Sequence, residues 1–378
     1  MSRPEIRPVT TRADRKAFVD LAWAVYRDDP AWVPPLKSEV HALLDPAKNP
    51  WFGHARAALW LAERDGQPVG RISAQVDDLV IEHMGAGLGQ WGMFEALDGE
   101  AAAALIATAE DWLREQGMSR AMGPISLSIW DEPGLLIKGF EQPPTVMMGH
   151  HRPEYAGWIE AAGYSKAKDL YTYELDIRPE MSPLMARLVS SAERNPRIKF
   201  RAVDKAHFDR DARVILNLLN DAWSNNWGFV PLTEAEIAYA GKKLKPIIYE
   251  DLVRIAELDG EPVAFMITLP DINELTADLN GRLLPFGWAK LLWRLRKPHT
   301  SRARVPLMGV ASKLHGTRLA SQLAFTLIEQ IRRPCVGKFG VTHGEFGWVL
   351  EDNQGMLSIA QLPGAEINKI YRIFEKAL

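Results

Sequence analysis

The sequence repeats itself across its two halves. The residues Ala62–Val69 (AERDGQPV) return 194 positions later as Ala256–Val263 (AELDGEPV). At the same offset, Ile6–Val9 (IRPV) is matched by Phe200–Val203 (FRAV). Two matches in one register indicate a duplicated unit. Half of a 378-residue chain has the size of an ordinary domain rather than of a solenoid repeat.

Both halves share one expected order of elements, namely a strand, helices, a hairpin, a strand, a helix, a strand, a helix and a strand. In each half the hairpin surrounds an Asp-Gly pair, at Asp65–Gly66 and Asp259–Gly260. This order predicts the α/β class, in its α+β form, with a mixed sheet flanked by helices. We therefore expect two tandem domains, residues 1–178 and 198–378, joined by a linker helix within residues 179–197.

Composition narrows the class of protein. The net charge is −3, so we expect no nucleic-acid partner. The single Cys335 cannot form an intrachain disulfide or a cysteine-rich zinc site, which suits a reducing cytoplasm, and we expect no metal. Neither a signal peptide nor a run of 18 apolar residues is found, so no membrane span is expected. The 13 Trp residues suit either well-filled cores or lipid-like ligands.

The clearest chemical motif lies at residues 308–319 (MGVASKLHGTRL), where an apolar strand runs through a turn into a helix. Backbone N–H groups and the positive end of the helix dipole attract anions at such a corner. Two cationic side chains add full charges there. A turn from a strand to a helix also contains Gly for backbone reasons alone. The candidate anion ligands of this turn are Val310, Ser312, Lys313, Gly316, Thr317 and Arg318.

In its order of elements, this segment resembles the GNAT acyltransferase superfamily. There, a loop of the form [Q/R]-x-x-G-x-[G/A] binds the pyrophosphate of coenzyme A. Lys313–Arg318 (KLHGTR) overlays that loop, with Lys and Arg at the two ends where the pattern has other residues. The resemblance implies acyl-CoA as co-substrate. It also implies a coenzyme A contact at Asn353 and a backbone N–H near Val310 that stabilises the reacting oxygen.

Acyl transfer to an amine needs a group that accepts a proton. Alternation along the expected strand 343–350 places His343 and Glu345 on one face, and these two residues are the candidate bases. The alternative is that both are solvent-facing residues at the end of a strand. His315, within the turn, is a weaker candidate.

The first half has no comparable turn. Before its Ala-rich helix, at residues 100–116, stands Leu97–Glu100, whose two carboxylates would repel a pyrophosphate. We expect this domain to be degenerate for cofactor binding and to shape the acceptor site instead. Its loop at residues 129–140, with Trp130 and Asp131, would cover a cleft or simply be a surface loop with an aromatic anchor.

Two segments of the second half bear on the acceptor. Trp223, Asn225, Asn226 and Trp227 lie where the superfamily binds acceptors, although packing at a helix end explains them equally well. Residues Leu283 to Lys297 predict an amphipathic helix that an ordinary GNAT order does not need.

The basic face of that helix carries Lys290, Arg294 and Lys297, with Trp and Leu largely opposite. Such a helix is typical of a membrane-surface element, and packing on the core with cations reaching into solvent is the alternative. We expect a cytoplasmic protein with a peripheral contact to the inner face of the inner membrane.

Three motifs, Trp223–Pro231, Asp131–Phe140 and Glu345–Asn353, are similar to those of a bacterial tandem-GNAT family that includes the bacterial ceramide synthases. The resemblance implies N-acylation of a long-chain sphingoid base, such as 3-ketosphinganine, by a fatty acyl-CoA. Two other functions stay open. One is a generic GNAT N-acetyltransferase acting on a small amine, and the other is a non-catalytic module that binds acyl-CoA or a lipid.

Overall fold

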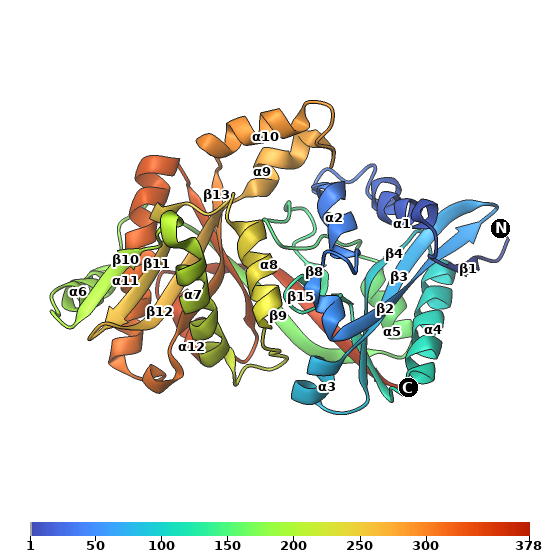
Figure 1. Ribbon diagram of the computed structural model, residues 1–378, viewed down its shortest axis with the longest axis horizontal. Helices are drawn as coiled ribbons and strands as arrows, with labels where there is room; N and C mark the ends of the chain where they lie inside the picture. Colours follow the sequence, from blue (N-terminus) through green and yellow to red (C-terminus); the bar gives the residue numbers. More distant parts are fainter. Residues whose placement is uncertain (1) are drawn as a thin grey trace.

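A single mixed sheet runs through both halves of the chain in the computed structural model, which describes residues 2–378 (Figure 1). Its thirteen strands follow the order β1-β2-β3-β4-β5-β15-β9-β14-β13-β12-β11-β10, with β8 beside β15. Helices cover both faces of the sheet (Figure 1). The predicted mixed α/β class is confirmed.

The first repeat supplies nine strands and five helices, and a linker helix follows it. The strands are β1 Glu5–Pro8, β2 Ala55–Arg64, β3 Gln67–Asp77, β4 Leu88–Ala96, β5 Arg120–Gly123, β6 Ile125–Ser126, β7 Glu132–Pro133, β8 Leu135–Lys138 and β9 Ser165–Asp176. The helices are α1 Arg12–Val25, α2 Lys37–Leu43, α3 Asp78–Met84, α4 Gly99–Glu115, α5 Tyr155–Ala161 and the linker helix α6 Pro183–Glu193, with a 3₁₀ turn η1 at Pro50–Gly53.

The second repeat follows the same plan, with one insertion. Its strands are β10 Ile198–Ala202, β11 Val253–Leu258, β12 Glu261–Pro270, β13 Arg302–Val310, β14 His343–Leu350 and β15 Glu366–Ala377. Its helices are α7 Phe208–Trp223, α8 Glu234–Leu244, α9 Ile272–Thr276, α10 Gly287–Arg296, α11 Arg318–Pro334 and α12 Gln354–Gln361. Short helical turns are η2 Lys205–His207, η3 Glu250–Leu252, η4 Ala277–Leu279, η5 Ser312–Leu314 and η6 Cys335–Phe339.

The two repeats exchange their last strands. β15, from the end of the chain, pairs with β5 of the first repeat, and β9, from the end of the first repeat, pairs with β14 of the second. The two exchanged strands pair with each other at the centre of the sheet. The last strand expected in the second half thus lies beside a strand of the first half, because an apolar alternation predicts a strand but not its partner. The boundaries at 178 and 198 stay a prediction.

Local sequence explains where elements begin and turn. Thr11 caps α1 and Asp14 completes the capping box. In the first hairpin, Asp65 and Gly66 both have positive φ, at 52° and 75°, as a two-residue turn between antiparallel strands requires. Helices α2 and α3 are short, with seven residues each, and were not expected.

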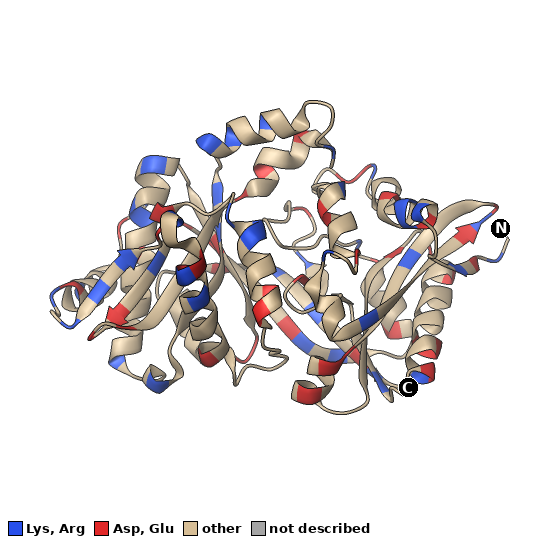
Figure 2. Cartoon of the chain, in the orientation of Figure 1, with Lys and Arg blue, Asp and Glu red and all other residues tan. Residues whose placement is uncertain are grey.

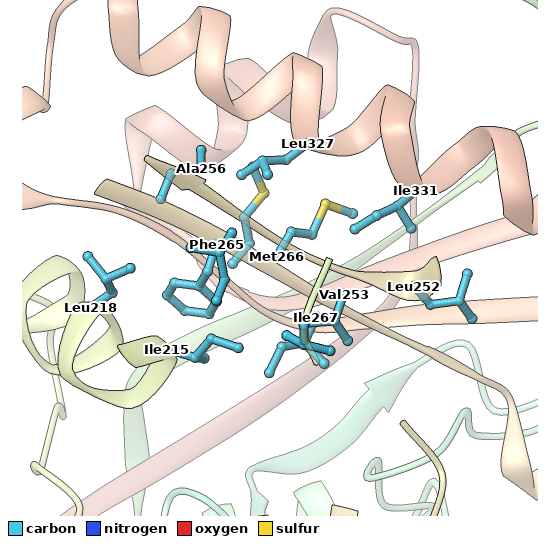
Figure 3. Packing of buried hydrophobic residues seen from close by; sticks show 14 of the residues in the cluster. Ile215, Leu218, Leu252, Val253, Ala256, Phe265, Met266, Ile267, Leu327 and Ile331 are labelled. Carbon is cyan, nitrogen blue, oxygen red and sulfur yellow. The ribbon is translucent and has the colours of Figure 1, made fainter. Parts of the chain in front are cut away.

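The core of the second repeat shows how the sheet is sandwiched. Figure 3 shows Phe265 directed from β12 toward Ile215 of α7, whereas Met266 points to the opposite face, toward Leu327 and Ile331 of α11. Successive residues of a strand face opposite sides, so β12 fills both layers at once. This packing fixes β12, and β12 holds β13 in place.

Candidate active site

Two neighbouring strands separate at the centre of the second repeat. β13 and β14 pair in parallel only over Arg302–Val305 and His343–Phe346. Beyond this point β13 continues to Val310 beside β12, and β14 continues beside β9. Pro306 has no N–H to extend the ladder. The strands diverge from here on and border a cavity of about 390 Å³.

The wall of this cavity is mainly apolar. It is formed by the two strands, by the linker with α6, and by α11 and α12. Apolar lining residues include Met181, Met185, Met266, Val305, Met308, Ile328, Ile331, Met356 and Ile359. Its polar lining includes Asn226, Arg332, Glu345 and Asn353. Such a surface suits a long apolar ligand with a reactive polar group.

The predicted cofactor turn forms one continuous corner at the C-terminal end of β13. Thr317 caps α11 and accepts a hydrogen bond from the backbone N–H of Ala320 at 3.2 Å. Gly316 has a φ of +73°, a conformation that favours glycine. Arg318 begins α11 and forms no salt bridge with any of residues 2–378. Asn353 caps α12 and lines the cavity, whereas the six predicted residues of the turn are not part of the cavity wall.

Carboxylates already engage part of this turn. The backbone N–H and the Oγ of Ser312 both donate to Asp221 at 2.7 Å, and these hydrogen bonds lower the pKa of that carboxyl group. Lys313 pairs with Glu261 at 3.0 Å. Of the two cationic side chains of this turn, Lys313 is therefore already paired with a carboxylate, and Arg318 is the one available to bind an anion.

Glu345 lies in a buried polar cluster at the point where β13 and β14 separate. It is 1% exposed, accepts hydrogen bonds from Thr145 and from Asn368 (2.7 Å), and lies 3.8 Å from the Nζ of Lys369. The Nζ of Lys369 finds no hydrogen-bond acceptor among residues 2–378. Burial lowers the pKa of this lysine. Glu345 is thus not a solvent-facing residue.

His343 has a different position. It lies at the start of β14, is partly exposed, and its Nδ1 is 2.9 Å from the Oγ1 of Thr342. It is not part of the cavity wall, so only one of the two candidate bases reaches the cavity. His315 lies in the turn, with its Nε2 2.8 Å from the carbonyl oxygen of Val310.

Val310 and Glu345 lie far apart. Glu345 is in register with Arg304, and Val310 is six residues further along β13, or about 20 Å at roughly 3.3 Å per residue. One thioester carbonyl cannot contact both groups. Nearer to Glu345, the pairing of β14 with β9 is interrupted between Phe346 and Val349, and Gly347 has a φ of +144° there. Such a bulge leaves backbone groups unpaired.

An aromatic wall borders the cavity toward the first repeat. Trp223 donates its Nε1 hydrogen to the carbonyl of Met308 at 3.1 Å. Trp130 of the first repeat stacks on Trp223, with ring centroids 5.9 Å apart, and the ring of Trp348 lies 5.8 Å from that of Trp223. The predicted substrate residues Trp130 and Trp223 therefore meet across the two repeats, and of the predicted substrate residues Trp223 and Asn226 line the cavity.

The other predicted substrate residues lie apart from this wall. Asn225 is exposed and does not line the cavity. Trp227 does not line the cavity and packs on the apolar cluster that Trp348 also contacts, with the Nζ of Lys168 5.5 Å from its ring centre. Asp131 accepts a hydrogen bond from Ser128 at 2.8 Å, and burial raises its pKa to about 6.

The corresponding corner of the first repeat holds a carboxylate. Asp98 caps α4 and accepts hydrogen bonds from the N–H groups of Glu100 and Ala101 at 3.1 and 3.0 Å. Arg64 pairs with the same carboxylate. Where β4 and β5 separate, a Cβ on Gly92 would lie 2.1 Å from the carbonyl oxygen of Ile125, so the chain itself fills the gap. These contacts favour a degenerate cofactor site, which stays a prediction.

Sequence analysis missed four residues that surround Glu345. Thr145, Arg304, Asn368 and Lys369 come from the first repeat, from β13 and from the last strand. Of these four residues, only Lys369 could have been predicted to be buried from the sequence pattern. Alternation along β15 puts it on the same buried face as Tyr371 and Ile373. Arg304 is 2% exposed and donates to the carbonyls of Gly347, at 2.9 Å, and Val146.

The predicted amphipathic segment lies away from the cavity. No side chain of α10 is fully buried against the rest of residues 2–378, and Phe286 and Trp293 are 77% and 73% exposed. Lys290 and Arg294 both pair with Asp278, so this one carboxylate offsets one of the two positive charges. No helix within residues 2–378 is long and apolar enough to cross a membrane.

Within the same residues, no three His, Cys, Asp or Glu side chains are grouped to hold a metal ion.

Comparison with known sequences gives two full-length relatives. The bacterial ceramide synthase of Caulobacter vibrioides (strain NA1000 / CB15N) is 43% identical over 374 residues, covering 98% of this chain and 97% of that protein. Protein YghO of Escherichia coli (strain K12) is 42% identical over 376 residues, covering 99% of this chain and 95% of that one. No family model matches the chain.

Solved structures share the fold at low sequence identity. A tandem GNAT protein from the clavulanic acid biosynthesis pathway superposes with a TM-score of 0.57 at 15% identity, covering 99% of this chain and 98% of that one. A GCN5-related N-acetyltransferase from Sphaerobacter thermophilus gives 0.54 at 14% identity, covering 100% and 96%. The predicted tandem GNAT fold is confirmed. The chain is an acyltransferase and belongs to the family that includes the bacterial ceramide synthase of Caulobacter vibrioides.

Proposed function

We propose that the protein transfers a fatty acyl group from acyl-CoA to the amine of a long-chain sphingoid base of the 3-ketosphinganine type. The observation that carries this proposal is the mainly apolar cavity of about 390 Å³ that reaches buried Glu345. Burying an acyl tail there gains about 25 cal/mol per Å² of apolar surface, and an acetyl group has little such surface. The relative named bacterial ceramide synthase supports the same chemistry.

Residues of the second repeat would hold the co-substrate. We assign the pyrophosphate of coenzyme A to the turn from Ser312 to Arg318, where the N-terminus of α11 attracts anions. The arm of coenzyme A then runs along the gap between β13 and β14, past Val310 and Asn353. Bound there, acyl-CoA supplies an activated thioester next to the aromatic wall.

In the reaction, the neutral amine nitrogen attacks the thioester carbonyl carbon, a C–N bond forms and the C–S bond breaks. The amine proton passes to a base, coenzyme A leaves as the thiolate, and protonation of that thiolate balances the step. We assign the base to Glu345, directly or through one water, because it is the candidate base in the cavity wall. We assign the stabilisation of the carbonyl oxygen to backbone N–H groups at the Gly347–Trp348 bulge, where the pairing of β14 with β9 is interrupted.

The first repeat would complete the acceptor site rather than bind a second cofactor. Trp130 reaches across to stack on Trp223, and Thr145 donates a hydrogen bond to Glu345. The sphingoid head group would then lie between this aromatic wall and Asn226. Asp98, on the α4 terminus, would keep a pyrophosphate away from the first repeat.

We further propose that α10 rests on the inner face of the cytoplasmic membrane. Figure 2 shows basic positions along α10 at the edge of the molecule, and Leu284, Phe286 and Trp293 are more than 70% exposed on the same segment. Asp278 offsets one of the two charges of Lys290 and Arg294, which weakens the attraction to an anionic surface, whereas insertion of the apolar side chains adds a contribution that salt does not screen. A long-chain sphingoid amine is poorly soluble in water and would reside in such a membrane, so the contact would bring the enzyme close to its acceptor.

Release of free thiol from acyl-CoA tests the proposal. Purified protein is mixed with palmitoyl-CoA alone, with a short soluble amine, and with a long-chain sphingoid amine. Release that depends on the long-chain amine supports the proposal, and release with the short amine instead supports a generic N-acetyltransferase. Binding without release supports a non-catalytic module. This alternative stays open because the carboxylate of Asp221 already accepts a hydrogen bond from the Ser312 N–H of the cofactor turn.

A further inference from the structure

The linker between the repeats forms one wall of the cavity, although joining two domains does not require this. Met181 and Met185 line the cavity, and Met185 is 3% exposed. Arg332 of α11 donates to the carbonyls of Ile177 and Pro179, at 3.0 and 3.3 Å, and holds the linker against the helix. The linker is therefore a fixed part of the site.

The position of this wall along the cavity indicates what it contacts. The cofactor turn lies at the N-terminus of α11, whereas Ile331 and Cys335 line the cavity at its C-terminal end. From Arg318 to Ile331 the helix rises about 20 Å at 1.5 Å per residue. Glu345 is in register with Arg304, toward this second end. A thioester near Glu345 would thus extend its acyl tail away from the cofactor turn.

We infer that the linker, through Met181 and Met185, binds the acyl tail of the thioester together with Ile328 and Ile331 of α11 and Cys335 of η6. This inference rests on the proposed function, since it concerns the tail of the same acyl-CoA. The unbranched methionine side chains adapt to tails of different shape. The cavity wall at this end also includes four polar residues, Asp176, Glu180, Ser182 and Arg332.

Photolabelling locates the tail without relying on turnover. Palmitoyl-CoA that carries a diazirine at the terminal carbon of its acyl chain is bound to the full-length protein. The complex is irradiated, and the adducts are mapped by mass spectrometry. We expect adducts on residues 179–185 or 328–335, competed by excess palmitoyl-CoA. Adducts on Trp223 or Trp130 instead, or no competed adduct, would overturn the inference. If labelling is as expected while no amine is acylated, the proposed function fails and the inference stands.

Two variants of the linker give a matched comparison. Met181→Asp places a charge in the tail wall, and Leu184→Asp places one three residues further on, at a side chain that is 55% exposed and outside the cavity wall. Met181→Asp should lower the ratio of palmitoyl-CoA to acetyl-CoA affinity at least tenfold, and Leu184→Asp should leave it unchanged. Equal ratios in both variants, in folded protein, would contradict a role for the linker.

Discussion

The Nζ of Lys369 lies 3.8 Å from Oε2 of Glu345, and neither side chain is more than 1% exposed. Lys369 belongs to β15, which has crossed into the first repeat's half of the sheet, and Glu345 belongs to β14 beside the cavity. The exchange of strands thus brings a buried cation to the proposed base. Thr145 of the first repeat donates to the same carboxylate, so both repeats build the site.

Replacing Glu345 by Gln should lower kcat by about 10²–10⁴-fold, because the amide cannot accept the amine proton. Acyl-CoA affinity should stay within a few-fold, since the cofactor turn is untouched. Steady-state thiol release and calorimetry measure the two quantities. The matched control is Glu174→Gln, at the register partner of Glu345 on β9. Near-normal turnover of Glu345→Gln at every pH would remove this residue from the mechanism.

Removal of the lysine should act mainly on stability. Lys369→Met leaves Glu345 without its nearby buried cation, and breaking one side of a buried pair costs about 3–5 kcal/mol. Adding Glu345→Gln to the same chain should recover part of that loss, because no unpaired charge then remains. Urea unfolding of the two single variants and the double variant measures the coupling. Strictly additive losses would show that the two side chains do not interact.

Arg318→Glu should weaken coenzyme A binding by about 1–3 kcal/mol, the range for losing a charge-assisted contact. Lys313→Glu should have a smaller effect, because Lys313 already pairs with Glu261. Lys338→Glu, in η6 at the other end of α11, is the charge-matched control. Calorimetry with coenzyme A decides this. Unchanged affinity in Arg318→Glu would mean that the pyrophosphate lies elsewhere.

Asp271 should make the fold less stable as the pH rises. It is 0% exposed, accepts a hydrogen bond from the Val146 N–H at 3.0 Å, and burial raises its pKa to about 6 from an ordinary value of 3.8. The folded state therefore holds this proton more tightly than the unfolded state. Between roughly pH 4 and pH 6, the favourable contribution of the protonated carboxyl group is lost progressively.

Asp271→Asn removes this titration and keeps an oxygen for the Val146 N–H. The free energy of unfolding of the unmodified protein, relative to the variant, should fall by on the order of 2–3 kcal/mol from pH 4 to pH 6 at about 1.4 kcal/mol per pKa unit. Urea titrations at several pH values measure it. A difference that stays constant with pH would show that Asp271 titrates normally.

The membrane contact should depend on apolar side chains more than on charge. The double change Phe286→Ser and Trp293→Ser should release the protein from anionic vesicles in co-sedimentation, and added salt should release the unmodified protein only in part. Leu97→Ser, at a side chain that is 38% exposed in the first repeat, is the control. Absence of vesicle binding by the unmodified protein would remove this contact from the account.

Elements that depend on a local sequence pattern were predicted correctly. Strand β14 has the bounds that were expected, because alternation along a strand is a local property. The cofactor turn was found for the same reason. The strand exchange was missed, since β9 and β15 have partners that only the folded chain selects.

The site was predicted only in part for a similar reason. Glu345 was found because it follows the alternation of its own strand. Thr145, Asn368 and Lys369 reach it from sequence distances of 200, 23 and 24 residues, and no local pattern connects them. The pairing of Trp130 with Trp223 also depends on how the repeats pack, so the sequence suggested both residues but not their contact.

The most direct test of the central claim is to identify the product. Purified protein is incubated with palmitoyl-CoA labelled with ¹³C in its acyl group and with a long-chain sphingoid amine, and products are identified and quantified by mass spectrometry. We predict a labelled N-acyl amide in equal amount to the coenzyme A released, strongly reduced in Glu345→Gln. Labelled free fatty acid without amide, or amide formed equally well by Glu345→Gln, would contradict the account.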